Sequence, residues 1–195
     1  MTTLCHRESK ESSSGARPNQ SIEPAVLLRF DSDRAVDAEC AWLNSSFVRQ
    51  MSRVYVLDPR ERVSASFSAQ GIMATLGAEL DGVVEGEVRI ALLPRPELSQ
   101  QHGYVHAGVL TTVLDSACGY AALTVAPAGH EVLTVEFKVN FLRPAVADRF
   151  VAIGKVIKAG KTLTVCQGEV VGERGSRREV IAVMQATIIH VPGNA

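Results

Sequence analysis

Residues 106–125 have the sequence HAGVLTTVLDSACGYAALTV, and this stretch decides the fold. At about 100° per residue, its larger apolar side chains fall on one broad face, which predicts a single core helix of roughly 30 Å. Pro127 and Gly129 follow and are expected to terminate it. The core face consists of Leu110, Val113, Leu114, Ala117, Cys118 and Ala121. Cys118 is therefore expected to be a core residue rather than a nucleophile.

An adjacent edge of this helix carries small side chains and one acid. Its members are Gly108, Thr111, Asp115, Gly119 and Ala122. Small side chains allow another backbone or a thin ligand to come close, and a carboxylate beside an apolar face costs free energy unless it is paired or hydrated. Two interpretations of Asp115 stay open. It accepts hydrogen bonds from a neighbouring loop, or it lies at a cleft with a pKa raised by desolvation and takes a proton from water.

The segments that flank the helix predict an antiparallel sheet. We expect a helix over residues 58–69, two strands over 76–80 and 83–93 joined around Asp81-Gly82, and four strands over 131–142, 150–158, 163–173 and 179–191. Consecutive strands mostly pair antiparallel, and a long apolar helix has to be covered by the sheet. The sequence therefore predicts an α+β domain in which about six antiparallel strands wrap around one long central helix.

The first strand after the central helix shows a clear period of two. Val135, Phe137, Val139 and Phe141 are expected on one face, and Thr134, Glu136, Lys138 and Asn140 on the other.

Composition indicates one globular domain with an additional segment. The chain has 195 residues, of which 46% are hydrophobic and 21% charged, and this suits one domain of ordinary size. We expect residues 1–55 to form a partly disordered N-terminal extension, because their first part is polar and has no helical or strand period. Residues 56–195 are expected to form the domain.

Charge and cysteine usage exclude several classes. The formal net charge is −1, which gives no general attraction to nucleic acid or anionic membrane. No run of about 18 apolar residues is present, so we expect no membrane span. Neither G-x-S-x-G nor G-x-G-x-x-G occurs. Cys5, Cys40, Cys118 and Cys166 have no C-x-x-C spacing, and we interpret them as reduced thiols of a cytoplasmic protein.

The start of the central helix is a second candidate feature. The backbone N–H groups of Ala107 and Gly108 are expected to point outward from the positive end of the helix, where an oxyanion or a polarised carbonyl could approach them. A plain helix start with a flexible glycine is the alternative. His102 and His106 are four residues apart, but no further His or Cys lies nearby in sequence, so no metal site is predicted.

Together these residues resemble a known family. The pattern Gln100-x-x-Gly103-x-x-His106-Ala107-Gly108, then Asp115 and Gly119-Tyr120-Ala121, then LTVEFKVNFLRPA over residues 133–145, is similar to the hotdog-fold thioesterases and most of all to the PaaI-like acyl-CoA thioesterases. The similarity spans about residues 60–191. It implies the hotdog fold and hydrolysis of an acyl-CoA thioester to a free carboxylic acid and CoA, with no cofactor or metal.

The resemblance also implies roles for individual residues. Asp115 would be the general base or nucleophile, and the N–H of Ala107 would polarise the thioester carbonyl beside Gly108. Gln100 would help to hold the water or the carbonyl, Thr134 would orient the water, and His106 would shape the loop or contact the thioester. Relatives usually carry Asn at the position of Gln100 and Gly at that of Ala107. The site would lie between two chains of a homodimer or homotetramer.

Cations are needed for the phosphates of CoA, and we expect them at Lys138, Arg143 and Lys158. Two other functions are kept as alternatives. One is a hotdog hydratase or dehydratase that uses His106 and Asp115 to move a proton at an acyl carbon. The other is a non-catalytic protein that binds acyl-CoA.

Overall fold

The computed structural model describes residues 58–193. The predicted N-terminal extension, residues 1–55, lies outside the described residues, as do Cys5 and Cys40. The elements in chain order are α2 (Pro59–Ala69), α3 (Gly71–Leu76), β1 (Glu79–Val84), β2 (Glu87–Leu92), η2 (Pro96–Leu98), α4 (Ala107–Val125), β3 (His130–Phe141), β4 (Arg149–Ala159), β5 (Leu163–Arg174) and β6 (Arg177–Pro192).

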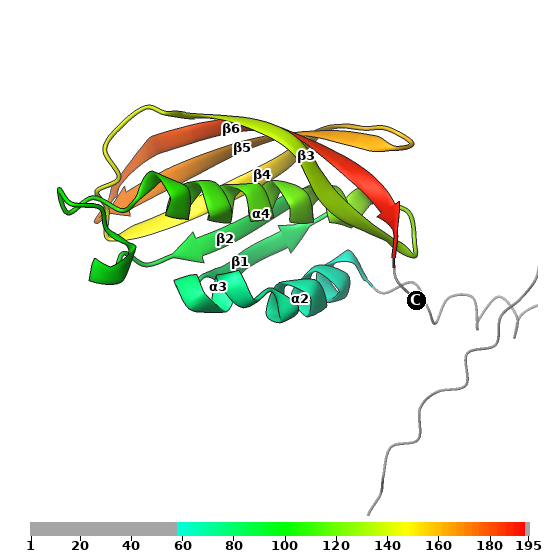
Figure 1. The fold of residues 1–195 in the computed structure, drawn as a ribbon, viewed down its shortest axis with the longest axis horizontal. Coiled ribbons are helices and arrows are strands. Elements are labelled where there is room, and N and C mark those ends of the chain that lie inside the picture. Colours follow the sequence, from blue (N-terminus) through cyan, green and yellow to red (C-terminus); the bar gives the residue numbers. More distant parts are fainter. Residues whose placement is uncertain (1–57, 194–195) are drawn as a thin grey trace, which may run out of the picture. The chain divides into compact units, whose positions relative to one another are not determined.

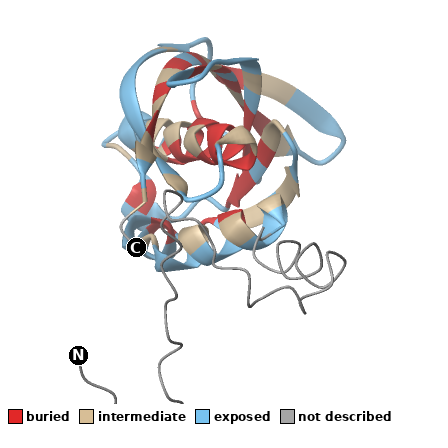
Figure 2. Cartoon of the chain, turned by 90° about the vertical axis from the view of Figure 1, so that its right-hand side faces the viewer, coloured by how far each residue is buried: buried red, intermediate tan, exposed pale blue. Residues whose placement is uncertain are grey.

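The six strands form one antiparallel sheet in the order β1-β2-β4-β5-β6-β3. The sheet curves around α4, and α2 and α3 lie beside β1 at the open side (Figure 1). The end-on view of Figure 2 shows the buried residues of α4 enclosed by the sheet. This arrangement confirms the predicted α+β architecture of six antiparallel strands around one central helix.

Two glycines of the sheet let α4 approach it closely. A Cβ on Gly154 of β4 would lie 2.3 Å from the carbonyl carbon and oxygen of Ala117, and one on Gly168 of β5 would lie 2.8 Å from Cys118 Sγ. The predicted core face of the helix is buried, with Leu114, Ala117 and Cys118 all 0% exposed. Contact this tight maximises dispersion between helix and sheet and leaves no room between them.

By length and composition alone, α4 could cross a membrane, contrary to the expectation from sequence that no stretch qualifies. The 18-residue window that passes this test is 61% buried inside the fold, against the sheet. An apolar helix of this length is therefore what the covered core of this domain requires.

The hairpin turn differs from the prediction. Asp81-Gly82 lies inside β1, where the pairing with β2 shifts register between Leu80 and Gly82. The chain reverses instead at Glu85-Gly86, where Gly86 has a φ of 76°, and the Gly86 N–H donates to Thr124 Oγ1 at 2.7 Å. Glycine adopts positive φ without a steric cost, so a contact with α4, distant in sequence, selects the second of two possible turns.

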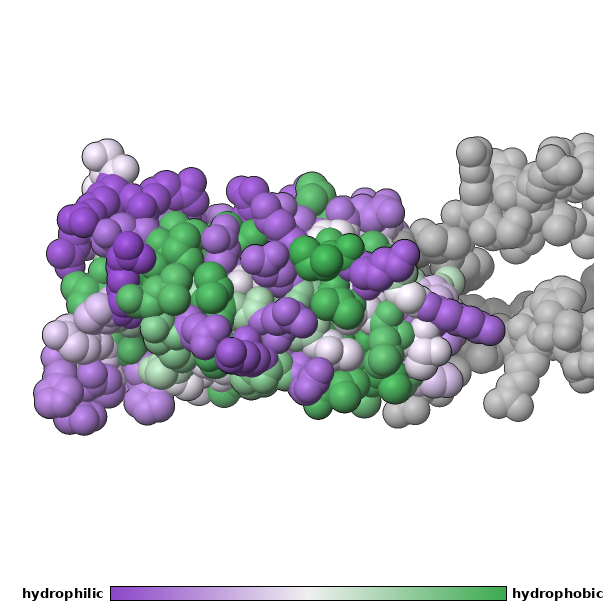
Figure 3. All heavy atoms as spheres, turned by 90° about the horizontal axis from the view of Figure 1, so that it is seen from above, coloured by the Kyte–Doolittle hydropathy of each residue, from purple (hydrophilic) through white to green (hydrophobic). Residues whose placement is uncertain are grey.

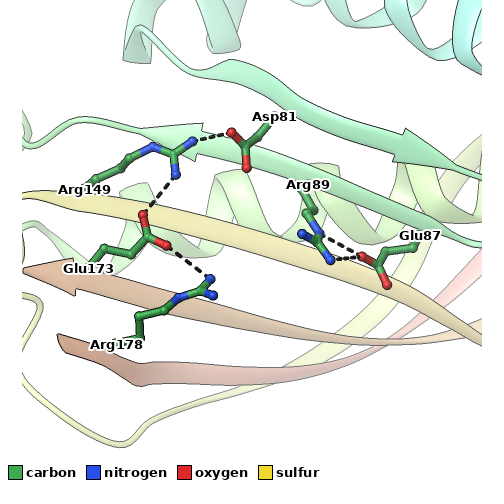
Figure 4. A network of polar contacts seen from close by, with 6 residues as sticks. All are labelled: Asp81, Glu87, Arg89, Arg149, Glu173 and Arg178. Carbon is green, nitrogen blue, oxygen red and sulfur yellow. Dashed lines mark hydrogen bonds and ion pairs between the residues drawn. The ribbon is translucent and has the colours of Figure 1, made fainter. Parts of the chain in front are cut away.

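Asp81 has a different role, in a surface network of charges (Figure 4). Its carboxylate pairs with Arg149, whose guanidinium also contacts Glu173 at 3.0 Å, and Glu173 in turn contacts Arg178 at 3.1 Å. The hydrogen bond to Glu173 is the main cause that raises the pKa of Arg149. The network joins β1, β4, β5 and β6, although exposed pairs of this kind contribute little each.

The N-terminal helical segment is longer than predicted. The first helix ends at Ala69 as expected, but a second helix, α3, covers Gly71–Leu76, where a strand was expected to begin at Leu76. Gln70 joins the two helices with extended backbone angles, φ −83° and ψ 95°. Its N–H donates to Phe67 O and its carbonyl accepts from Met73 N–H, each at 3.0 Å. The junction is therefore fixed from both sides.

The alternation predicted for β3 is wrong at Thr134 and Val135. The pairing of β3 with β6 shifts register between Thr134 and Glu136, which leaves Val135 in a β-bulge. Thr134 therefore pairs with buried Ile188 and faces α4, whereas Glu136 pairs with Thr187 and accepts a hydrogen bond from its hydroxyl at 3.2 Å. Without the bulge, Thr134 would point to the outer face of the sheet.

Candidate active site

Asp115 lies at mid-length on α4, half-buried, at the boundary between the core and an open cavity. Thr134 Oγ1 donates to Asp115 Oδ1 at 2.8 Å from β3. Burial raises the pKa of the Asp115 carboxyl, and the hydrogen bond from Thr134 offsets this only in part. Both interpretations made from sequence are thus met in part: the acid has a hydrogen-bond donor, and it is desolvated at a cavity.

The cavity beside Asp115 has a volume of about 380 Å³. Its wall comes from α2, the junction between α2 and α3, α4 and β3, and consists of Ser66, Ala69, Gln70, Asp115, Ser116, Gly119, Tyr120, Glu131, Val132 and Thr134. Most of these side chains are polar. Sequence analysis identified Asp115 and Thr134 but missed Gln70, Ser66 and Ser116, because the covering helices were not expected to reach the central helix.

The start of α4 offers one free amide rather than two. His106 is the N-cap residue, and its Nδ1 accepts the Gly108 N–H at 2.9 Å. The N–H groups of Val109 and Leu110 are directed at the carbonyl of His106, at 3.0 and 3.4 Å. Among residues 58–193, no acceptor lies within hydrogen-bond distance of the Ala107 N–H. The expectation that Gly108 presents a free amide is wrong, and Ala107 keeps this role.

A second cavity, of about 360 Å³, opens at this helix start. It is lined by Gln100, Gln101, Tyr104, Val105, His106, Ala107, Phe141, Arg143, Pro144 and Ala145. The side-chain oxygen of Gln100 accepts the N–H of His102 within its own loop, so its amide nitrogen is left for another partner. The structure thus brings Gln100, His106, Ala107 and Arg143 together at one end of α4.

The two groups of candidate residues do not meet within this chain. Asp115 follows Ala107 by eight residues, which places it about 12 Å further along the helix at 1.5 Å per residue. They also line different cavities. The chain therefore carries two separate groups of candidate residues, which we name the acid half-site, Asp115 and Thr134, and the amide half-site, Gln100, His106 and Ala107.

The three predicted cations are widely separated. Arg143 lines the cavity at the helix start, and its guanidinium donates to Val180 O at 3.0 Å. Lys138 pairs with Gln185 on the outer face of the sheet, away from α4. Lys158 lies near the end of β4, two residues after Val156. The N–H of Val156 donates to Gly86 O, and Gly86 contacts Thr124 near the C-terminal end of α4, so Lys158 is far from the start of that helix. Only Arg143 joins the candidate residues of its own protomer.

The remaining reactive side chains are placed as core or surface residues. Cys118 and Cys166 are free and buried, and burial raises the pKa of the Cys166 thiol to about 12. Burial likewise raises the pKa of Cys118 well above its usual range, as expected for a core thiol. His102 and His106 are both exposed, and within residues 58–193 no group of three or more His, Cys, Asp or Glu could hold a metal ion.

An antiparallel sheet wrapped around one long central helix defines a hotdog-fold protein. The sequence matches the thioesterase superfamily over residues 102–178. The chain belongs to this superfamily.

Individual relatives agree with this assignment. A thioesterase family protein from Silicibacter pomeroyi is 45% identical, with a TM-score of 0.68, and the match covers 69% of this chain and 99% of that one. The medium/long-chain acyl-CoA thioesterase YigI of Escherichia coli is 24% identical over 133 residues, 60% of this chain and 83% of YigI. The PaaI protein of the E. coli phenylacetic acid degradation operon, 20% identical with a TM-score of 0.63, covers 70% of this chain and 96% of its own and shows the same fold.

Proposed function

We propose that this protein is a PaaI-like acyl-CoA thioesterase, which hydrolyses an acyl-CoA thioester to a free carboxylic acid and CoA. The observation that carries the proposal is the Asp115 carboxyl, held by Thr134 at 2.8 Å beside a cavity and with a raised pKa. A desolvated carboxylate at a cavity is a stronger base than one in bulk water. The name of the relative YigI, an acyl-CoA thioesterase, supports the same substrate class.

In the proposed mechanism, Asp115 acts either as the general base toward a water molecule or as the nucleophile toward the thioester carbonyl. Thr134 donates to Oδ1, which leaves Oδ2 to take a proton from water. The water oxygen adds to the carbonyl carbon, the C–S bond breaks, and the proton passes to the CoA thiolate. The Ala107 N–H stabilises the negative charge on the carbonyl oxygen, with the dipole of α4 behind it.

This mechanism requires two chains, because the acid and the amide lie about 12 Å apart along one helix. We propose a homodimer in which Asp115 of one protomer faces the start of α4 in its partner; a homotetramer of two such dimers keeps the same sites. The edge strand β3 supports this, since Leu133 and Val135 are 59% and 57% exposed. The surface above β3 and β6 mixes apolar patches with charges (Figure 3), and an exposed apolar edge favours association.

The amide half-site would receive the thioester and the start of the CoA chain. Gln100 keeps a free amide nitrogen there, and Arg143 supplies a cation at the mouth of the same cavity. A Cβ on Gly108 would lie 3.1 Å from His106 Nδ1, so glycine at this position preserves the cap that leaves the Ala107 amide free. Lys138 and Lys158 could contact phosphates only from other protomers or from the outer surface. The buried, free Cys118 and Cys166 fit a cytoplasmic protein.

Release of the CoA thiol from acyl-CoA esters tests this proposal. We expect the wild-type protein to release thiol, and Asp115→Asn to lower kcat by about 10²-fold or more, because the base is lost while its shape is kept. The oligomer of the variant should remain intact in size-exclusion chromatography. A change in acyl unsaturation without thiol release would favour the hydratase instead, and tight binding of acyl-CoA without turnover would favour a binding protein.

A further inference from the structure

The cavity beside Asp115 contains a polar network that the proposed chemistry does not use. The side-chain oxygen of Gln70 accepts the hydroxyl of Tyr120 at 3.2 Å and that of Ser116 at 3.5 Å. Ser116 and Tyr120 are only 9% and 7% exposed. Buried hydroxyls without partners are costly, so Gln70 satisfies both of them and is in turn held in one orientation.

Gln70 is a rigid part of the cavity wall. Its backbone is bonded on both sides, to Phe67 O and to Met73 N–H, at 3.0 Å each. The helices that it joins are anchored in the core by Val63 and Met73, which are 0% and 1% exposed. Since its oxygen is occupied by two hydroxyls, its amide nitrogen is the group left for a ligand. Among residues 58–193, no acceptor lies within hydrogen-bond distance of Gln70 Nε2.

The charged groups of the cavity select further among ligands. Asp115 and Glu131 line it, and within the described residues no Lys or Arg does. Burial is the main cause that raises the pKa of Tyr120, and the nearby charge of Glu131 adds to it. Within one chain, a ligand that carries a carboxylate meets two acids and no Lys or Arg of the same cavity, so it would be repelled. An uncharged oxygen would not.

We propose that Gln70 is a specificity-determining residue, which selects acyl groups that carry an uncharged oxygen, hydroxyl or carbonyl, a few bonds from the thioester. This inference rests on the proposed function. Ser116 and Tyr120 follow Asp115 on α4 by one and five residues, about 1.5 Å and about 7.5 Å along the helix, so the carboxamide that they hold lies on the order of 5 Å along the helix from the acid. That spacing suits an oxygen on the third or fourth acyl carbon. An alkyl chain there leaves the amide donor unpaired.

Three CoA esters of four-carbon acyl groups test this. They are butanoyl-CoA, 3-hydroxybutanoyl-CoA and succinyl-CoA, compared by kcat/KM from thiol release. We expect the wild-type protein to prefer the 3-hydroxybutanoyl ester to the butanoyl ester by about tenfold, the worth of one well-placed hydrogen bond. Succinyl-CoA should be the poorest of the three.

Gln70→Met removes the donor and keeps the length of the side chain. It should bring the ratio between the hydroxylated and the plain ester to about 1, whereas a purely structural role would lower both rates together. Tyr120→Phe should lose part of the ratio, because it frees the carboxamide to rotate. Gln167→Met, on the exposed outer face of β5, is the matched control and should leave the ratio unchanged.

Two results would overturn the inference while the proposed function stands. In one, the wild-type protein hydrolyses both uncharged esters at equal kcat/KM. In the other, Gln70→Met retains the wild-type ratio. If the wild-type protein releases thiol from no CoA ester, including longer acyl chains, the proposed function itself fails, and the specificity assigned to Gln70 fails with it.

Discussion

Replacing Ala107 by proline removes one N–H group and little else. Ala107 is the first residue of α4, the position at which proline is most favoured in helices. The preceding residue, His106, has φ −62° and ψ 137°, which is the conformation that a residue before proline adopts. The chain already uses this arrangement at the start of α2, where Pro59 follows the N-cap Asp58. We therefore expect Ala107→Pro to fold with a stability within about 0.5 kcal/mol of the wild type.

The expected loss of activity follows from which backbone N–H groups at this helix start are already hydrogen-bonded. The Gly108 N–H is taken by His106 Nδ1, and those of Val109 and Leu110 are directed at His106 O. Only the Ala107 N–H is available to a carbonyl oxygen of the substrate. Deleting a single donor to a developing oxyanion costs about 10²–10³-fold in kcat, and the neighbouring amides cannot replace it.

Thiol release from the best acyl-CoA ester measures the effect, and Ala107→Gly, which keeps the N–H, is the matched control. The control should remain within a few-fold of the wild type. If Ala107→Pro keeps more than about a third of the wild-type kcat while its oligomer is intact, the helix start does not polarise the thioester.

The same variant tests whether the site is shared between chains. When Asp115→Asn and Ala107→Pro subunits are mixed and reassembled, half of the dimers are mixed, and each mixed dimer has one intact site if the acid and the amide come from different chains. Activity should then recover to about a quarter of the wild type. Without recovery, both groups act within one protomer, and the dimeric mechanism is wrong.

Three other predictions concern Asp115 and the helix–sheet contact. Because its pKa is raised, activity should increase with pH through an apparent pKa above that of an ordinary aspartate, and the pH–rate profile of kcat/KM checks this. The folded state therefore binds the Asp115 proton more tightly than the unfolded state. The contribution of this proton to the free energy of unfolding is complete below the pKa of the unfolded state, and it is lost as pH rises through the pKa of the folded state. Asp115→Asn should therefore unfold at a higher temperature than the wild type at pH 7, a difference that vanishes near pH 3; a lower Tm at pH 7 would contradict this. Gly154→Ala places a Cβ 2.3 Å from the backbone of Ala117 and should lower the free energy of unfolding in urea by about 3 kcal/mol. The control Gly119→Ala, whose Cβ would have nothing within 4 Å, should not lower it. Equal stability of the two variants would disprove the close contact.

The central helix and the sheet were predictable because local pattern determines them. One apolar face and a terminating Pro127 define α4, and the alternation of the later strands defines most of the sheet. The half-sites were predictable in part. Asp115 is the one acidic residue on a helix edge that otherwise carries small side chains. Ala107 lies at the helix start and has a small side chain itself.

What escaped prediction depends on partners distant in sequence. The bulge at Val135 arises from pairing with β6, and it decides that Thr134 reaches Asp115. The cap that removes the Gly108 amide depends on the rotamer of His106, which sequence does not specify. Gln70 reaches the cavity because the helix is interrupted at this residue, between α2 and α3. No local pattern in the sequence indicates that its side chain faces α4.

The glycines under α4 have a consequence for how such a protein can change. Because Gly154 and Gly168 bring the strands into direct contact with the helix, the inner side of α4 offers no volume from which a binding cavity could be enlarged. Longer or bulkier ligands have to be accommodated on the opposite side, in the cavity under α2. The wall on that side comes from α2 and Gln70, so the ligand preference can diverge by substitutions there while Asp115 and the sheet stay the same.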